Sequence, residues 1–191
     1  MKKITPHLPN TLYCYDPVAM EPMLVTETGQ QSFAVPLVIP DRRNKVENTL
    51  EYPYDCIGLV LAFFKNDEIP FYSTGFLVGH NKVLTAAHSV YMKIRLNNPK
   101  ADTVYFIPAV DGLVKHQEAI VAAGFDYCSG FPQQEFEEME SYRSCDYATL
   151  TLSQSVTRQK YFRLFPSLWS QFLREVKMVG YAADRAELNP I

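Results

Sequence analysis

The stretch STGFLVGHNKVLTAAH, residues 73–88, decides the expected fold. Two short apolar runs flank the dipeptide His80-Asn81, a pattern that is typical of two β-strands joined by a tight turn. The second run, KVLTA, leads through small alanines to His88. Small neighbours let the backbone approach an imidazole ring closely, and the end of a strand is a rigid place for a general base. His88 is therefore either a buried structural histidine or a catalytic one.

Short apolar segments separated by turn signals continue along the chain and predict an all-β barrel or sandwich. They are CIGLVLAFF (56–64), FYSTGFLVG (71–79), KVLTA (82–86), DTVYFIPAV (102–110), KHQEAIVAAGF (115–125), CDYATLTL (145–152) and EVKMVGY (175–181). Two segments do not fit this pattern. QQEFEEMESYR (133–143) is either a helical turn or an acidic loop, and PSLWSQFLREV (166–176) is either a helix or a long hairpin connection.

The composition bounds the class of protein. With 47% hydrophobic and 20% charged residues in 191, the chain can fill a core and is not of disordered type. The net charge of −3, without a basic stripe, argues against nucleic acid as a partner. No apolar run approaches the about 18 residues that a membrane span needs, so we expect no membrane association.

The cysteines and acidic residues do not predict a metal site or a cofactor. Cys14, Cys56, Cys128 and Cys145 are scattered and lack C-x-x-C spacing, which argues against structural zinc and leaves one or two disulfides open. The acidic run QQEFEEME (133–140) is better explained as a solvated insertion, because adjacent carboxylates on a loop do not converge on an ion.

Asp146 is the residue that could orient His88. A catalytic histidine needs an acceptor for its Nδ1 proton, and an aspartate supplies one. Asp146 opens the alternating run DYATLTL, and an aspartate that enters an apolar strand is costly to bury without a partner. Taken alone, it is also compatible with an exposed residue at the start of a strand.

Together the two segments resemble the trypsin-like serine peptidases. That family carries T-A-A-H or T-A-G-H at its base and D-x-A-x-L at its orienting acid, as this sequence does at His88 and Asp146. The chain is most similar to the glutamyl endopeptidase-like branch, in order, from about residue 38 to residue 184. The segments that carry this similarity are KVENTLEYPYDCIGLV (45–60), FIPAVDG (106–112) and VKMVGYAAD (176–184).

The resemblance implies an all-β fold, the double Greek-key β-barrel of trypsin-like serine proteases, with the first barrel complete and the second truncated. Residues 1–45 would be an N-terminal extension or pro-segment, 46–155 the first barrel with the catalytic His and Asp, and 156–191 the incomplete start of the second barrel. It implies a serine endopeptidase in which His88 is the base and Asp146 the orienting acid, with a polypeptide substrate, no cofactor and a monomeric state.

The nucleophile of that family is not found in this sequence. The family places it in a G-x-S-G loop after the last strand matched here, and the only glycine after Asp146 is Gly180. The remaining candidates are most simply surface or turn serines, and we predict none of them as nucleophile: Ser129, Ser153, Ser155, Ser167 and Ser170. We therefore expect either a fragment of a longer peptidase or a truncated, catalytically inactive pseudo-protease that binds protein.

Several positions depart from the family pattern. Ser89 stands where the family often has a cysteine bridged to one upstream, so that bridge cannot form. Ala109 stands where the branch often has glycine, and Ala182 stands where it usually has proline. A third interpretation, an unrelated β-barrel with fortuitous motifs, would be supported if His88 and Asp146 lay far apart.

The N-terminal region bears on processing. The branch is made as a zymogen, and its mature start resembles VIPDRRNKVENT, so residues 1–37 are expected to be a pro-segment ending before Val38. The first residues, MKKITPHLPN, lack the apolar core of a signal peptide. The resemblance implies secretion, whereas the sequence itself leaves the compartment open.

Overall fold

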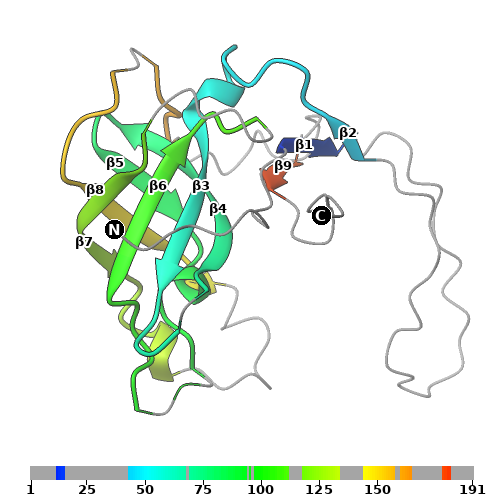
Figure 1. The fold of residues 1–191 in the computed structure, drawn as a ribbon. Helices are drawn as coiled ribbons and strands as arrows, with labels where there is room; N and C mark the ends of the chain where they lie inside the picture. Colours follow the sequence, from blue (N-terminus) through cyan, green and yellow to red (C-terminus); the bar gives the residue numbers. More distant parts are fainter. Residues whose placement is uncertain are drawn as a thin grey trace, which may run out of the picture.

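The computed structural model of the protein describes residues 12–15, 43–67, 69–93, 95, 97–111, 118–133, 144–157, 160–164 and 178–181. Within these residues the fold is all-β, and its main body is a closed antiparallel barrel of six strands (Figure 1). The barrel strands are β3 (Ile57–Phe63), β4 (Phe71–Gly79), β5 (Lys82–Thr85), β6 (Thr103–Pro108), β7 (Ile120–Tyr127) and β8 (Ala148–Leu152).

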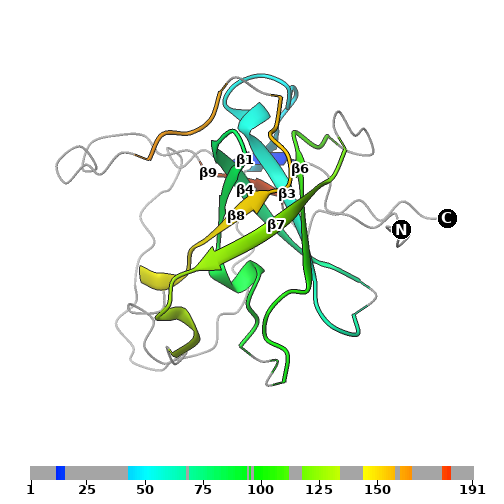
Figure 2. The same ribbon diagram turned by 90° about the vertical axis from the view of Figure 1, so that its left-hand side faces the viewer.

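The strand order around the barrel is β3-β4-β5-β8-β7-β6. The first three strands are neighbours in sequence, and β6 then returns to pair with β3, which is the connection of a Greek key. Strand β8 closes the barrel by pairing with both β5 and β7, and Figure 2 shows β7 and β8 side by side across the wall. Closure leaves no free edge along these strands, which removes a site for aggregation.

The interior of the barrel is filled by side chains from all six strands. Val60, Phe106 and Leu150 are fully buried there, together with Leu77 and Val83. The packing is tight at Gly58, where an added Cβ would lie 2.4 Å from the Phe106 ring and 2.7 Å from the Ile107 carbonyl oxygen. Only a glycine fits between these two strands at this point.

A second cluster lies on the outer face of β3 and β6. Alternate residues of these strands point outward, and Leu59, Leu61 and Ile107 are buried beneath Val46 and Tyr181. Strand β3 is therefore buried on both faces, which explains its continuous apolar sequence. The outer cluster connects the barrel to the rest of the described chain.

A separate three-stranded sheet lies beside this outer cluster, as Figure 1 shows. It consists of β2 (Arg43–Lys45), β1 (Leu12–Tyr15) and β9 (Met178–Tyr181) in that order, and all of its pairings are antiparallel. The Tyr181 backbone N–H donates to Thr74 Oγ1 at 2.9 Å, and its phenol donates to the Val110 carbonyl at 3.1 Å. These bonds attach β9 to the barrel.

Most strands predicted from the sequence are confirmed. Strand β4 has the predicted bounds, β3, β5 and β6 lie within the predicted segments, and the His80-Asn81 turn is present. Strands β1 and β2 lie in the N-terminal region, for which the sequence predicted no strand. The segments 134–143 and 165–177 lie outside the described residues, so the predictions on them stay open.

Ala109 has a backbone conformation that residues other than glycine rarely adopt. Its φ is 52°, in the left-handed region that favours glycine, and its side chain is buried. The Thr49 hydroxyl donates to the Ala109 carbonyl at 3.0 Å and fixes this turn after β6. A glycine at this position would adopt the same conformation without strain.

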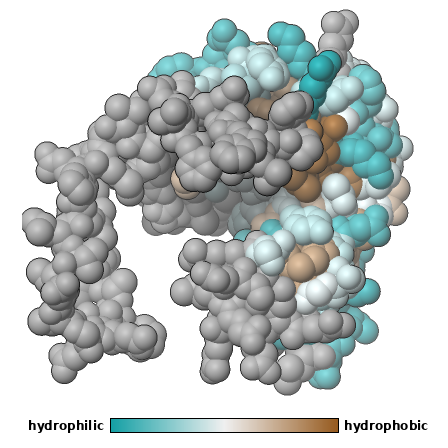
Figure 3. Space-filling view, turned by 180° about the vertical axis from the view of Figure 1, so that it is seen from behind, coloured by the Kyte–Doolittle hydropathy of each residue, from teal (hydrophilic) through white to brown (hydrophobic). Residues whose placement is uncertain are grey.

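The surface seen from behind the barrel is mainly hydrophilic or neutral where it is described, with hydrophobic residues confined to small areas (Figure 3). The most exposed large apolar side chains come from separate parts of the sequence: Ile69, Leu164 and Met178. No helix within the described ranges has the length and apolar character that crossing a membrane would require.

Candidate functional site

The ends of two neighbouring barrel strands bring His88 and Asp146 together. Thr85, the last residue of β5, pairs with Ala148, the first residue of β8. His88 follows Thr85 in the short 3-10 turn η3 (Ala87–Ser89), and Asp146 precedes Ala148. Because the strands are antiparallel, both residues lie at the same end of the barrel.

Two hydrogen bonds join the two residues. The His88 backbone N–H donates to Asp146 Oδ1 at 2.9 Å, and His88 Nδ1 lies 2.7 Å from Asp146 Oδ2. The same carboxylate therefore holds both the main chain and the ring of His88. Such a bidentate arrangement fixes the position and the rotation of the imidazole.

This arrangement determines which nitrogen of His88 is basic. A carboxylate oxygen can only accept a hydrogen bond, so the bonded Nδ1 carries the proton and Nε2 holds the free lone pair. The His88 side chain is 49% exposed, whereas that of Asp146 is 18% exposed. The ring is thus held from one side and remains accessible from the other.

The residues around His88 explain why the ring can sit at this corner. Ala87 and Ser89 are fully buried, so the turn η3 packs directly on the barrel interior. The Thr85 hydroxyl donates to the Thr74 carbonyl at 2.9 Å and fixes the strand end. The Phe71 ring meets the His88 ring edge-on, with centroids 6.4 Å apart. These contacts come from β4 and β5 and limit movement of the turn.

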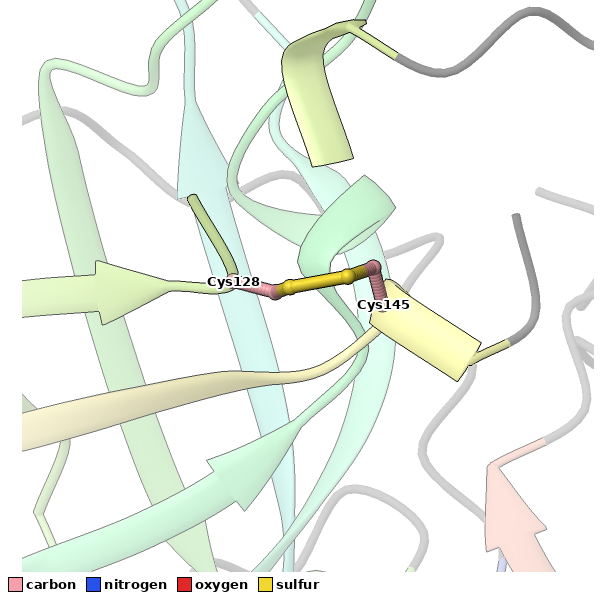
Figure 4. The surroundings of a disulfide bond; sticks show 2 residues. All are labelled: Cys128 and Cys145. Atoms are coloured by element: carbon pink, nitrogen blue, oxygen red, sulfur yellow. A yellow bond between two sulfur atoms is a disulfide. The ribbon is translucent and has the colours of Figure 1, made fainter. Parts of the chain in front are cut away.

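A disulfide lies directly behind Asp146. Cys128 follows β7 and Cys145 precedes Asp146, and Figure 4 shows their sulfur atoms bonded across this corner. The Cα atoms are 5.3 Å apart, within the usual range for disulfides. The sequence left the pairing open. The pairing of Tyr127 with Ala148 explains the disulfide, because it brings the cysteines at the ends of these two segments close together.

Lys93 is a charged neighbour of the pair that the sequence did not indicate. Its ammonium lies 4.6 Å from the centre of the Phe131 ring, in the turn that follows Cys128. Burial lowers the pKa of Lys93, and the negative charge of Asp146 acts in the opposite direction. Lys93 therefore stands in the electrostatic field of the carboxylate that orients His88.

The serines considered as nucleophiles do not complete the site. Ser129, Ser153 and Ser155 are exposed. The structure gives no hydrogen bond between any of them and His88, whereas Ser167 and Ser170 lie outside the described residues. Ser89 is fully buried, and its hydroxyl has no hydrogen-bond partner among the described residues. It follows His88 in sequence and its side chain is buried, so it is not placed as a nucleophile for Nε2.

A surface pocket of about 340 Å³ lies away from this pair. Tyr52, Lys160, Tyr161 and Arg163 line it, and neither His88 nor Asp146 contributes. It is formed by the segment that follows β8, where Phe162 is hydrogen-bonded to Leu77 near the other end of β4. In the described part of the chain, no group of three or more His, Cys, Asp or Glu side chains could hold a metal ion.

Comparison with known proteins gives matches at the level of structure only. Neither a family model nor a curated protein matches the sequence. The match to a Glu endopeptidase solved in complex with MPD covers 58% of this chain and 45% of the endopeptidase chain, with 22% sequence identity and a TM-score of 0.46. The match to a thermostable serine protease, AL20, from an extremophilic microorganism covers 51% of this chain and 42% of the protease chain, with 22% sequence identity and a TM-score of 0.39.

The chain thus spans less than half the length of either protein. The resemblance expected from the sequence is matched by structural similarity to chymotrypsin-fold serine proteases over about half of the chain, and the described barrel has six strands.

Proposed function

We propose that this chain carries the histidine and aspartate of a serine endopeptidase site. The observation that supports this most directly is the bidentate contact between Asp146 and His88, which leaves Nε2 basic and accessible. A histidine that served only the core would not need its ring half exposed and its Nδ1 held by a carboxylate. If the chain were an unrelated barrel with fortuitous motifs, these residues would be expected to lie far apart, but they are in contact.

The chemistry follows from the two nitrogens of His88. Nε2 removes the proton from a serine hydroxyl as its oxygen attacks the carbonyl carbon of a peptide bond. The resulting imidazolium then donates that proton to the leaving amide nitrogen, and an acyl-enzyme forms. Water, deprotonated by the same Nε2, then attacks the acyl carbon, and the imidazolium returns the proton to the serine oxygen as the acid product leaves. Asp146 accepts a hydrogen bond from Nδ1–H throughout and stabilises the imidazolium without becoming protonated.

The reaction needs two parts for which no residue of this sequence is assigned. One is the serine, and the other is the pair of N–H groups that bind the oxyanion, whose loss costs about 3 kcal/mol per donor. The proposal therefore includes a double-barrel protein in which residues 156–191 begin the second barrel and a following loop supplies both. The substrate would be a polypeptide, with the protein acting as a monomer.

The N-terminal segment belongs to the same proposal. If residues 1–37 are a pro-segment, their removal takes β1 away from between β2 and β9, because β1 pairs with both. Processing would then change the sheet that contacts the outer face of the barrel. The first barrel itself does not include this strand and would stay closed.

The test begins with the transcript beyond the codon for Ile191. If the frame continues into a glycine-flanked serine, the complete chain should react with a fluorophosphonate probe and cleave a casein substrate. The variant His88→Ala should then lose about 10⁶-fold in kcat. The matched control is His80→Ala, because His80 is an exposed histidine in the β4–β5 turn and contacts neither Asp146 nor the turn η3.

The alternative function is a pseudo-protease that binds protein and does not cleave it. It is favoured by one observation, that none of the described serines Ser129, Ser153 and Ser155 is hydrogen-bonded to His88. A stop codon directly after Ile191, or a complete chain that neither reacts with the probe nor cleaves casein, would support this alternative and rule out the endopeptidase.

A further inference from the structure

The end of the β7–β8 ladder and two backbone hydrogen bonds position the backbone around Asp146. The ladder between β7 and β8 reaches Tyr127 and Ala148 at this end, so Asp146 lies just beyond the last paired residue of β8. The Cys128 backbone N–H donates to the Tyr147 carbonyl at 3.2 Å, and the Tyr147 N–H donates to the Cys145 carbonyl at 2.9 Å. The second of these bonds is local and does not reach another strand.

The disulfide adds a covalent attachment one residue before the carboxylate. Cys145 is bonded to Cys128, and the Phe131 N–H donates to the Cys128 carbonyl at 2.9 Å, which fixes the partner cysteine in its turn. Phe131 is fully buried in the barrel interior, so this turn is anchored in the core. The bond thus connects the residue before Asp146 to a fixed point.

We propose that the Cys128–Cys145 disulfide is a positioning element for the Asp146–His88 pair, so that its reduction releases the carboxylate from the imidazole. The inference deepens the proposed function and rests on it for its catalytic meaning. The structural part, a covalent attachment of Cys145 one residue before the carboxylate that holds His88, stands on the geometry alone.

Both cysteines are partly exposed, so a small reductant can reach the bond. A dithiol supplies two electrons and two protons: the S–S bond breaks, Cys128 and Cys145 become thiols, and the reductant becomes a cyclic disulfide. The sulfur of Cys145 lies under Gly130, where an added Cβ would be 3.2 Å away. Once reduced, residues 144–147 lose their covalent attachment to the turn after β7.

The charged and titratable groups near the released carboxylate are His88 and Lys93. The Lys93 ammonium lies over the Phe131 ring, and this contact does not involve the disulfide. We therefore expect the carboxylate to move away from His88 while remaining within the field of Lys93.

The test uses the 191-residue chain labelled with ¹⁵N and follows two protons of His88 by NMR, before and after treatment with dithiothreitol. One is the backbone amide bonded to Asp146 Oδ1, and the other is the Nδ1 proton bonded to Oδ2. After reduction we expect amide exchange to accelerate about tenfold or more, the factor associated with losing a hydrogen bond to a charged group, and the Nδ1 signal to disappear.

Internal controls separate positioning from general stabilisation. The Ala109 amide, bonded to the Ile57 carbonyl at 2.9 Å at the start of β3, should keep its chemical shift, because the barrel stays folded. The variant Cys128→Ser/Cys145→Ser should show the reduced-state behaviour without reductant and should not respond to it. If this variant does not fold, reduction of the folded wild-type chain gives the same comparison.

Three results would overturn the proposal. The first is an unchanged His88 amide after thiol titration has shown that the bond is broken. The second is a chemical-shift change at the Ala109 amide as large as that at the His88 amide, which would make the disulfide a general stabiliser only. The third is a finding that both cysteines are free thiols in protein purified without reductant. None of these results depends on peptidase activity, so they are distinct from failure of the proposed function.

Discussion

The barrel wall and the corner that carries His88 are held together in different ways. The wall is stabilised by many apolar contacts and by continuous pairing, with β3 buried on both faces. The corner depends on polar contacts: two hydrogen bonds that Asp146 accepts from His88, one that Thr85 donates, and the disulfide behind them. When one contact is lost in the wall, many neighbouring contacts still hold the strands in place. When one contact is lost at the corner, the position of His88 changes directly.

This difference predicts that stability and site geometry can be changed separately. A substitution in the wall should lower the free energy of unfolding without moving the His88 ring in the molecules that remain folded. A substitution at the corner should disturb the ring while the barrel persists. The variants that test this difference lie in the barrel wall, at the corner, or at the boundary between the barrel and the three-stranded sheet.

The largest effect is expected for Phe106→Ala in the wall. Phe106 is fully buried and lies against Gly58, so its removal leaves a cavity that the closed barrel cannot easily collapse. The free energy of unfolding should fall by about 3–5 kcal/mol, as measured by urea denaturation followed by circular dichroism. The control is Ile69→Ala, because Ile69 is 65% exposed and its loss should cost less than about 0.5 kcal/mol. Equal effects of the two substitutions would contradict the assignment of the core.

Next in size is the loss of the disulfide by Cys128→Ser/Cys145→Ser. The cysteines are 17 residues apart, and a loop of this size stabilises the folded state by about 3 kcal/mol through the entropy of the unfolded chain. The same urea experiment measures this change. The control is the wild-type chain in dithiothreitol, which should show the same midpoint. A midpoint unchanged by either treatment would mean that the corner does not contribute to the global stability.

Tyr181→Phe tests the boundary between the barrel and the three-stranded sheet. The substitution removes the phenol that donates to the Val110 carbonyl and leaves that carbonyl without this donor. The expected cost is about 1 kcal/mol at neutral pH, again measured by urea denaturation. A variant as stable as wild type would indicate that this bond contributes nothing to the attachment of β9.

The same residue predicts a pH dependence. Burial raises the pKa of Tyr181 above its ordinary value of 10.0, and the negative charge of Asp111 adds to this effect. Above pH 10 the unfolded state therefore ionises first and binds fewer protons, so stability falls as the pH rises further. The wild-type chain should lose stability between pH 10 and 11 to a greater extent than Tyr181→Phe, which has no phenol to ionise. Parallel pH profiles would contradict this assignment.

The sequence predicts the wall well because the wall follows from local patterns. Alternation in 148–152, the continuous apolar run of β3 and the His80-Asn81 turn each reflect a short-range rule, and the strands form where expected. The contact between His88 and Asp146 was also predicted, although from the resemblance to a family and not from periodicity. Its catalytic role stays a prediction.

What the sequence did not predict depends on long-range pairing. Strand β1 has no apolar period of its own, and it forms because β2 and β9 lie on either side of it. The disulfide likewise depends on which strands are neighbours: 17 residues separate the cysteines, and only the pairing of β7 with β8 brings them together. Lys93 reaches the site through the fold of the loop after η3, for which no motif exists.

The smallest change in stability, and the sharpest test of the corner, is expected for Asp146→Asn. The His88 side chain is half exposed, and pairs of this kind contribute less than about 1 kcal/mol. An amide still accepts the His88 backbone N–H through Oδ1, but the atom in place of Oδ2 is now a donor. The neutral ring should therefore exchange tautomers, with Nδ1 accepting and the proton on Nε2, as read from the ¹⁵N shifts of the imidazole. Such a ring cannot act as a base through Nε2 even though the barrel is intact. A variant that keeps its proton on Nδ1 would show that Asp146 does not control the tautomer of His88.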